Sequence, residues 1–221
     1  MPEFTLYAGY ANTSTWSMRG WLAMKKSGAP FSEVFIRYRL KDDKARLMTI
    51  SPSGRVPLLI HERAEGAIKI WDSLAIAEYL NELFPDKRLW PEDAVARALA
   101  RSISAEMHSG FQAMRQNLDM DLTGRHAGMK LDAPGLAEDV ARVKAIWREC
   151  REKYGARGGP FLFGAFSLAD VMFAPVPFRF RTYGVELDPV CQAYAEAIFA
   201  DPDAREWEKR AETQPRDPLP A

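Results

Sequence analysis

The sequence predicts a two-domain protein, with an α/β domain over residues 1–84 and an all-helical domain over residues 92–212. Three observations support this division. Strand-like and helix-like segments alternate up to residue 84, and no convincing strand-like alternation follows residue 91. Between them, residues 85–91 combine two prolines with charged residues and predict a linker. A chain of 221 residues is long enough for two small domains that share an interface.

The first part of the α/β domain reads as strand, helix, strand. Residues 4–8 alternate apolar and polar side chains, residues 16–26 have helical periodicity that closes near Gly28, and residues 31–36 supply a second strand. A strand–helix–strand unit implies a parallel pair. The polar residues 37–50 predict a short irregular helix.

A hairpin and a helix complete this domain. Residues 58–60 and 67–71 flank the polar residues 61–66, and an apolar helical pattern at residues 73–84 predicts a helix that covers the sheet. The order β-α-β followed by β-β-α is the thioredoxin-like arrangement.

The second domain contains several helical stretches. Residues 94–119, 135–154 and 188–200 have amphipathic patterns. Ser167 and Asp170 form a capping-box pattern that should stabilise a buried helix start by about 1 kcal/mol. With no histidine predicted nearby, we interpret this pair as structural rather than as part of a hydrolase triad. Residues 213–221 predict a tail, frayed from residue 215.

Composition excludes several classes of partner. Lys+Arg 30 against Asp+Glu 30 gives no net charge for capturing nucleic acid or an anionic membrane. The N-terminus lacks a leader pattern and no run reaches the length of a membrane span, so a cytoplasmic protein is expected. Cys150 and Cys191 form neither a CxxC pair nor a zinc-ligand cluster; we expect buried thiols and no metal.

Two motifs in the first domain predict a ligand site. A turn rich in Ser, Pro and Gly delivers Val56-Pro57 into the apolar run 58–60, which leaves an unpaired strand edge at Val56. If this bond is cis, the backbone of Val56 can turn towards a ligand. Asp72-Ser73 precede a helical pattern, and a helix N-terminus binds carboxylates through its free N–H groups and dipole. The alternative is that these residues form only a strand entry and a helix cap.

The run from Gly54 to Leu59, the segment from Asp72 to Leu80 and the downstream helices resemble a soluble glutathione S-transferase, from Phe4 to about Arg210. The resemblance implies glutathione as a co-substrate and a homodimer. It implies that Val56 pairs through its backbone with the cysteinyl part of glutathione, and that Asp72 and Ser73 hold the γ-glutamyl group. The complete set of glutathione-binding candidates is Thr13, Arg55, Val56, Pro57, Asp72 and Ser73.

The loop between the first strand and helix should face the glutathione sulfur. Its hydroxyl run, Trp16 and Arg19 resemble the serine-type transferases, especially the zeta class of maleylacetoacetate isomerases. Counting back from Arg19 without gaps places Asn12 at the catalytic position, whereas Ser14 occupies it if the loop shifts by two residues; both stay candidates, with Thr13 next. Either an amide or a hydroxyl can donate the hydrogen bond. The alternative is that the loop only turns the chain and caps the helix.

The predicted reaction is attack of the glutathione thiolate on a small apolar electrophile, with Trp16, His108 and Arg115 as acceptor-pocket candidates. Two alternatives stay open: glutathione-dependent cis–trans isomerisation of the maleylacetoacetate type, and a non-catalytic glutathione-binding or scaffold role. Disulfide exchange is disfavoured because the loop has no cysteine.

Overall fold

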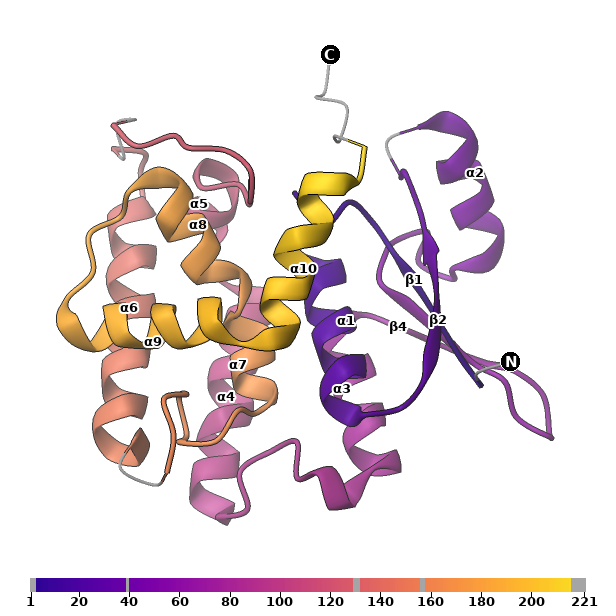
Figure 1. Ribbon diagram of the computed structural model, residues 1–221, viewed down its shortest axis with the longest axis horizontal. Helices are drawn as coiled ribbons and strands as arrows, with labels where there is room; N and C mark the ends of the chain where they lie inside the picture. Colours follow the sequence, from indigo (N-terminus) through magenta and orange to yellow (C-terminus); the bar gives the residue numbers. More distant parts are fainter. Residues whose placement is uncertain (1–2, 39, 129–131, 156–157, 216–221) are drawn as a thin grey trace. The chain divides into compact units, whose positions relative to one another are not determined.

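A four-stranded sheet organises the N-terminal part of the chain (Figure 1). Its strands are β1 (Phe4–Ala8), β2 (Phe31–Phe35), β3 (Leu58–His61) and β4 (Ile68–Trp71), in the order β2-β1-β3-β4. β1 is parallel to β2 and antiparallel to β3, and β3 is antiparallel to β4. The predicted parallel pair and the predicted hairpin are both confirmed.

This computed structural model describes residues 3–38, 40–128, 132–155 and 158–215. By packing, the described residues form two units: residues 3–87 with 206–215, and residues 88–205. Residues 216–221 of the predicted tail lie outside the described residues.

Helices α1 (Thr15–Ser27) and α3 (Ser73–Leu83) pack against each other and cover one face of the sheet, with α2 (Lys41–Ile50) on the other side (Figure 1). Helix α1 buries Trp21 completely. It ends at Gly28, whose φ of 71° favours glycine and whose N–H donates to Lys25 O. The sequence therefore predicted both α1 and its end.

Helix α2 is more regular than predicted, with ten residues of α-helix. Leu47 is its buried side chain, whereas Met48 is exposed. Before the helix, the N–H and Nε of Arg37 both donate to Asp43 Oδ2 at 2.9 Å. The hydrogen bond from Arg37 holds the pKa of Asp43 below its usual value. Local polar bonding thus supports a helix that buries little apolar surface.

The second unit is helical. A short 3-10 turn, η1 (Pro85–Lys87), precedes it. Its helices are α4 (Ala94–Ser109), α5 (Gln112–Asn117), α6 (Leu136–Tyr154), α7 (Leu168–Phe173), α8 (Pro175–Tyr183) and α9 (Pro189–Ala200). Within the described part of this unit, strand-like pairing is limited to isolated bridges before α7. The thioredoxin-like domain followed by a helical domain is therefore confirmed.

The amphipathic stretch 94–119 is two helices rather than one. Helix α4 ends at Ser109, with Gly110 as its C-cap, and Phe111 has a φ of 61°, which few non-glycine residues adopt. Arg115 donates from Nε to Gly110 O at 2.9 Å and from its Nη2 to Met107 O, which satisfies carbonyls at the end of α4. Side-chain periodicity continues across this break, so the pattern alone did not reveal it.

Aromatic residues form the core of the second unit. The ring centroid of Trp147 lies 5.5 Å from that of Phe180 and 4.9 Å from that of Tyr194. Helix α7 is entirely buried and begins with the predicted capping box. The carboxylate of Asp170 accepts from Ser167 N at 2.8 Å and Ser167 Oγ at 3.0 Å.

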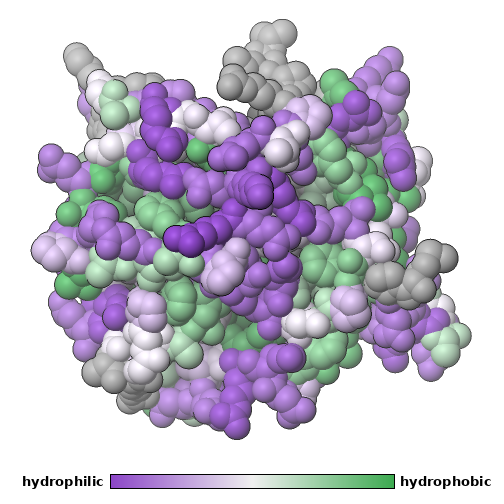
Figure 2. Space-filling view, viewed as in Figure 1, coloured by the Kyte–Doolittle hydropathy of each residue, from purple (hydrophilic) through white to green (hydrophobic). Residues whose placement is uncertain are grey.

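Helix α10 (Pro202–Thr213) is amphipathic. Hydrophilic side chains gather over its position in Figure 2, while Ala204, Trp207 and Ala211 are buried. The ring of Trp207 lies 5.4 Å from that of Trp21 in α1. The predicted domain boundaries at residues 84, 92 and 212 stay a prediction, but residues 206–215 pack with the first unit.

Candidate functional site

The sheet brings three sequence segments to one edge. Strand pairing sets Leu58 opposite Tyr7 on one side and opposite Trp71 on the other. The end of β1, the entry to β3 and the end of β4 therefore meet, and each leads into a predicted site segment. A Cβ on Gly9 would lie 3.3 Å from Val56 Cγ2 and 2.6 Å from Tyr38 Cε1. A side chain at residue 9 would therefore require the Tyr38 ring to move, and glycine allows the first loop to lie close to the Val56 turn without that shift.

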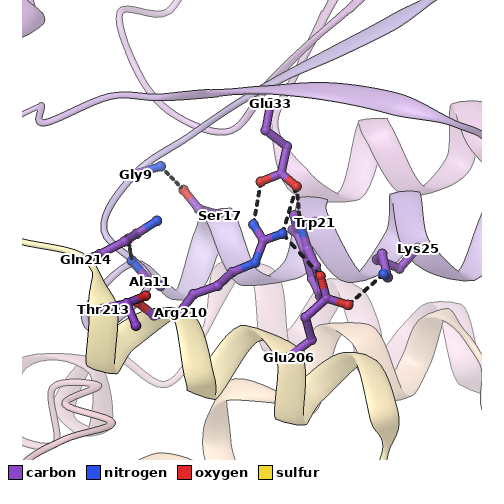
Figure 3. Close-up of polar contacts among 10 residues, drawn as sticks. All are labelled: Gly9, Ala11, Ser17, Trp21, Lys25, Glu33, Glu206, Arg210, Thr213 and Gln214. Carbon is purple, nitrogen blue, oxygen red and sulfur yellow. Dashed lines mark hydrogen bonds and ion pairs between the residues drawn. The ribbon is translucent and has the colours of Figure 1, made fainter. Parts of the chain in front are cut away.

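Hydrogen bonds organise the loop before α1. Ser14 N donates to Tyr10 O at 2.8 Å, which closes a turn around Asn12 and Thr13. Ser17 Oγ accepts from Gly9 N and from Ser14 Oγ, both at 2.8 Å (Figure 3 shows the Gly9 contact). The sequence did not single out Ser17, because N-capping predicts a bond to its backbone N–H at N3 and none to its hydroxyl.

The two candidates for thiol activation differ in their surroundings. Ser14 is buried, caps α1 by accepting from Ser17 N at 3.3 Å, and donates its hydroxyl proton to Ser17 Oγ. A bond from Ser14 to a ligand requires that donation to be given up. Asn12 and Thr13 are half-buried. The amide of Asn12 carries two N–H donors, so it can serve a ligand while keeping another partner.

The turn before β3 holds Val56 and Pro57. The Val56-Pro57 bond is cis. Gly54 N donates to Ser51 O at 3.0 Å and Ser51 Oγ donates to Arg55 O at 3.1 Å. Pro57 is buried close to α1, whereas Val56 is half-buried and Arg55 is exposed. The turn is thus anchored on its inner side.

Asp72 and Ser73 start α3. Asp72 has a φ of 79°, and its Oδ1 accepts from Leu74 N at 2.8 Å and Ala75 N at 3.4 Å. A non-glycine residue held at positive φ is often found at ligand sites. Ser73 is 1% exposed, and within the described residues its Oγ has no hydrogen-bond partner. An unsatisfied buried hydroxyl costs free energy that a ligand atom would recover.

The acceptor-pocket candidates lie in different places. Trp16 is half-buried on α1, with the guanidinium of Arg19 4.7 Å from its ring centroid. His108 is half-buried in the last turn of α4. Arg115 is on α5, where burial lowers the pKa of its guanidinium and its hydrogen bonds hold the end of α4. These contacts give Arg115 a structural role that the sequence did not predict.

Further features that bear on function in the described residues are the cysteines, the possible metal ligands and the long helices. Burial raises the pKa of both Cys150 and Cys191 to about 12, so neither thiol ionises near neutral pH. Among residues 3–38, 40–128, 132–155 and 158–215, no cluster of His, Cys, Asp and Glu suits a metal ion. No described helix is long and apolar enough to cross a membrane.

Sequence comparison identifies both parts of the chain. The family profile "Glutathione S-transferase, N-terminal domain" matches residues 13–83. The profile "Glutathione S-transferase, C-terminal domain" matches residues 133–214. The first match begins at Thr13, near the end of the loop, and contains the Val56 turn and the start of α3.

Individual relatives resemble most of the chain. A probable maleylacetoacetate isomerase of Caenorhabditis elegans is 26% identical over 83% of this chain and 82% of its own length. The maleylacetoacetate isomerase of Pseudomonas aeruginosa is 28% identical over 91% of this chain and 93% of its own length. A crystal structure of a glutathione transferase homolog from Burkholderia GL BGR1 with bound glutathione is 26% identical, covers 97% of this chain and 100% of its own, and has a TM-score of 0.70.

Proposed function

Because this chain belongs to the glutathione S-transferase family and is a glutathione-dependent enzyme, we propose that it catalyses cis–trans isomerisation of the maleylacetoacetate type. The observation that carries this proposal is the similarity to the isomerase of Pseudomonas aeruginosa, which extends over 91% of this chain. The zeta-like loop around Asn12 supports the same proposal. This reaction takes the place of attack on an apolar electrophile as the leading prediction.

Glutathione is proposed to bind along the sheet edge. The backbone of Val56 would pair with the cysteinyl part, in the manner of an added strand. The start of α3 would hold the γ-glutamyl group: Asp72 offers a carboxylate to its ammonium, and the buried Ser73 Oγ offers a hydrogen bond to its carboxylate. Arg55, Thr13 and Pro57 complete the proposed site.

Asn12 is proposed to activate the thiol. A free thiol has a pKa near 8.5, and lowering this by about two units requires about 2.7 kcal/mol in favour of the thiolate. One hydrogen bond to a charged acceptor supplies about 1.5–3 kcal/mol, and the N-terminus of α1 adds about 0.3–1 kcal/mol. We rank Asn12 above Ser14 because the Ser14 hydroxyl donates to Ser17 at 2.8 Å.

The isomerisation leaves glutathione unchanged. The thiolate sulfur bonds to the alkene carbon β to a carbonyl, and the π electron pair moves to the carbonyl oxygen as an enolate. The former double bond is now single and rotates. The electron pair then returns, the C–S bond breaks, and the thiolate leaves behind the trans alkene. Throughout, the protein needs to stabilise negative charge first on sulfur and then on oxygen.

Transfer of glutathione to an electrophile is a second candidate, favoured by the similarity to the glutathione transferase homolog from Burkholderia GL BGR1. It uses the same thiolate and differs in that the C–S bond persists in the product. Consumption of glutathione therefore separates the two reactions.

The test is maleylacetone isomerisation with and without glutathione, beside conjugation of chlorodinitrobenzene. We expect isomerisation that requires glutathione but does not consume it, and a loss of about 10- to 100-fold in Asn12→Ala, corresponding to one charge-assisted hydrogen bond. Ser14→Ala, the matched hydroxyl deletion, should lose less. Conjugation without isomerisation would overturn the proposal in favour of transfer.

A further inference from the structure

The loop that carries Asn12 is held by the end of the chain. Ala11 is 0% exposed; its N–H donates to Gln214 Oε1 at 2.8 Å and its carbonyl accepts from Trp207 Nε1 at 3.0 Å (Figure 3 shows the Gln214 contact). No backbone–backbone hydrogen bond among the described residues involves Ala11. Two side chains of residues 206–215, here called the C-terminal segment, therefore form the hydrogen bonds that the loop backbone does not give to the N–H and the carbonyl of Ala11.

These two bonds orient the peptide groups on either side of Ala11. The carbonyl held by Trp207 belongs to the peptide that leads into Asn12, and the N–H held by Gln214 belongs to the preceding one. A peptide group is planar, so fixing its oxygen also fixes the direction of the following N–Cα bond. The position of the Asn12 side chain thus depends on both bonds.

Polar contacts keep this part of α10 on the first unit. Glu33 Oε1 accepts from Arg210 Nη2 at 2.9 Å and from Trp21 Nε1 at 3.0 Å (Figure 3). Lys25 Nζ lies 2.7 Å from Glu206 Oε2, and its hydrogen bond lowers the pKa of Glu206. Trp207 itself is 1% exposed. The donor, Trp207 Nε1, and the acceptor, Gln214 Oε1, therefore lie in a segment that several polar contacts hold on the first unit.

We propose that Trp207 and Gln214 are positioning residues for thiol activation, which hold the Ala11 peptide so that Asn12 faces the glutathione sulfur. This inference rests on the proposed function and adds the C-terminal segment to it. Neither residue touches the reacting atoms; each acts through the loop.

The experiment measures the pKa of the bound glutathione thiol by its ultraviolet thiolate absorbance, in wild type, Gln214→Leu and Trp207→Phe. Gln214→Leu removes the acceptor at a half-buried position, so folding should be retained even if Trp207→Phe proves unstable. We expect each variant to raise the thiol pKa by about half a unit to one unit from about 6.5, which means about 1.5- to 3-fold less thiolate at pH 7 and about 3- to 10-fold less at about pH 5.5.

The pH profile of turnover separates positioning from general damage. In both variants kcat/KM should fall about 3- to 10-fold at about pH 5.5 and about 1.5- to 3-fold at pH 7, and approach the wild-type value at a pH above the raised pKa, where the thiolate forms without help. Partial unfolding would instead lower the rate equally at all pH values. Gln214→Glu, which keeps an acceptor oxygen, should restore the wild-type profile.

The matched control is Lys209→Ala, at an exposed position of α10, which leaves both bonds to Ala11 and the Lys25–Glu206 ion pair in place. It should leave the thiol pKa unchanged. If wild type lowers the thiol pKa and both test variants match it, the inference fails while the proposed function stands. If wild type itself leaves the thiol unshifted, the proposed function fails and this inference with it.

Discussion

At the scale of single residues, Asp170 shows how a carboxyl group can be both buried and structural. It is 0% exposed and accepts hydrogen bonds from Leu162 N at 3.0 Å and from Ser167. Burial raises its pKa to about 6, although these hydrogen bonds favour the charged form. The capping box thus stabilises the start of α7 at the cost of a desolvated charge.

The raised pKa predicts a pH dependence of stability. Asp170 binds its proton more tightly in the folded state, with a pKa of about 6 against an ordinary 3.8. Protonation of Asp170 therefore adds to the free energy of unfolding fully below pH 3.8, and this addition is lost as the pH rises through 6. This difference of about two units corresponds to about 3 kcal/mol at most. Asp170→Asn should remove this slope of the free energy of unfolding against pH, measured by urea unfolding at pH values from about 3.8 to 6. It should also lower the free energy of unfolding overall.

Ser167→Ala is the matched control, because it removes a hydrogen bond of 3.0 Å to the same carboxylate but keeps the titrating group. It should lower the free energy of unfolding by about 1 kcal/mol and retain the slope. A wild-type slope in Asp170→Asn would show that another group titrates.

At the scale of elements, the start of α3 combines a cap with a candidate ligand contact. Asp72 caps the helix by accepting a hydrogen bond from Leu74 N at 2.8 Å, and its positive φ makes it a candidate ligand contact. The two roles make different demands: capping needs an acceptor oxygen, whereas an ammonium group attracts a negative charge.

A pair of substitutions should separate these roles. Asp72→Asn keeps an acceptor and tolerates positive φ, so we expect little change in guanidinium unfolding but glutathione binding about tenfold weaker, measured by calorimetry. Asp72→Ala loses the cap as well and should cost about 1–2 kcal/mol of stability. Equal destabilisation by both would mean that the charge, not the cap, stabilises α3.

At the scale of the whole molecule, the first unit is built from two distant parts of the chain. Residues 206–215 join residues 3–87. The first unit is therefore complete only when the C-terminal segment is in place. The homodimer and the cytoplasmic location expected from the sequence stay predictions.

Trp207→Ala should therefore destabilise the sheet rather than α10 alone. Loss of this buried ring predicts a decrease of about 3–5 kcal/mol in the free energy of unfolding, and faster hydrogen exchange of amides in β1 and α1. Lys209→Ala, on the exposed side of the same helix, should change stability by less than about 0.5 kcal/mol. Unchanged exchange in β1 would contradict this role for α10.

The sequence by itself determined most of the elements, because periodicity, caps and turns depend on neighbouring residues; helix α10 was not among those it predicted. It predicted the strands, α1 with its end at Gly28, the capping box at Ser167 and the family from the Val56 and Asp72 segments. It did not predict the break at Phe111, where apolar periodicity runs on across a change in backbone direction.

Only the tertiary structure decided which partners the site residues have. The Ser14 hydroxyl donates to Ser17, and the Ala11 peptide is held by Trp207 and Gln214, 196 and 203 residues away. Such bonds form because packing brings an unpaired backbone group to a side chain from a distant segment. No local sequence pattern predicts these contacts, because the residues around Ala11 and those around Trp207 and Gln214 are read separately and neither stretch specifies the other as its partner.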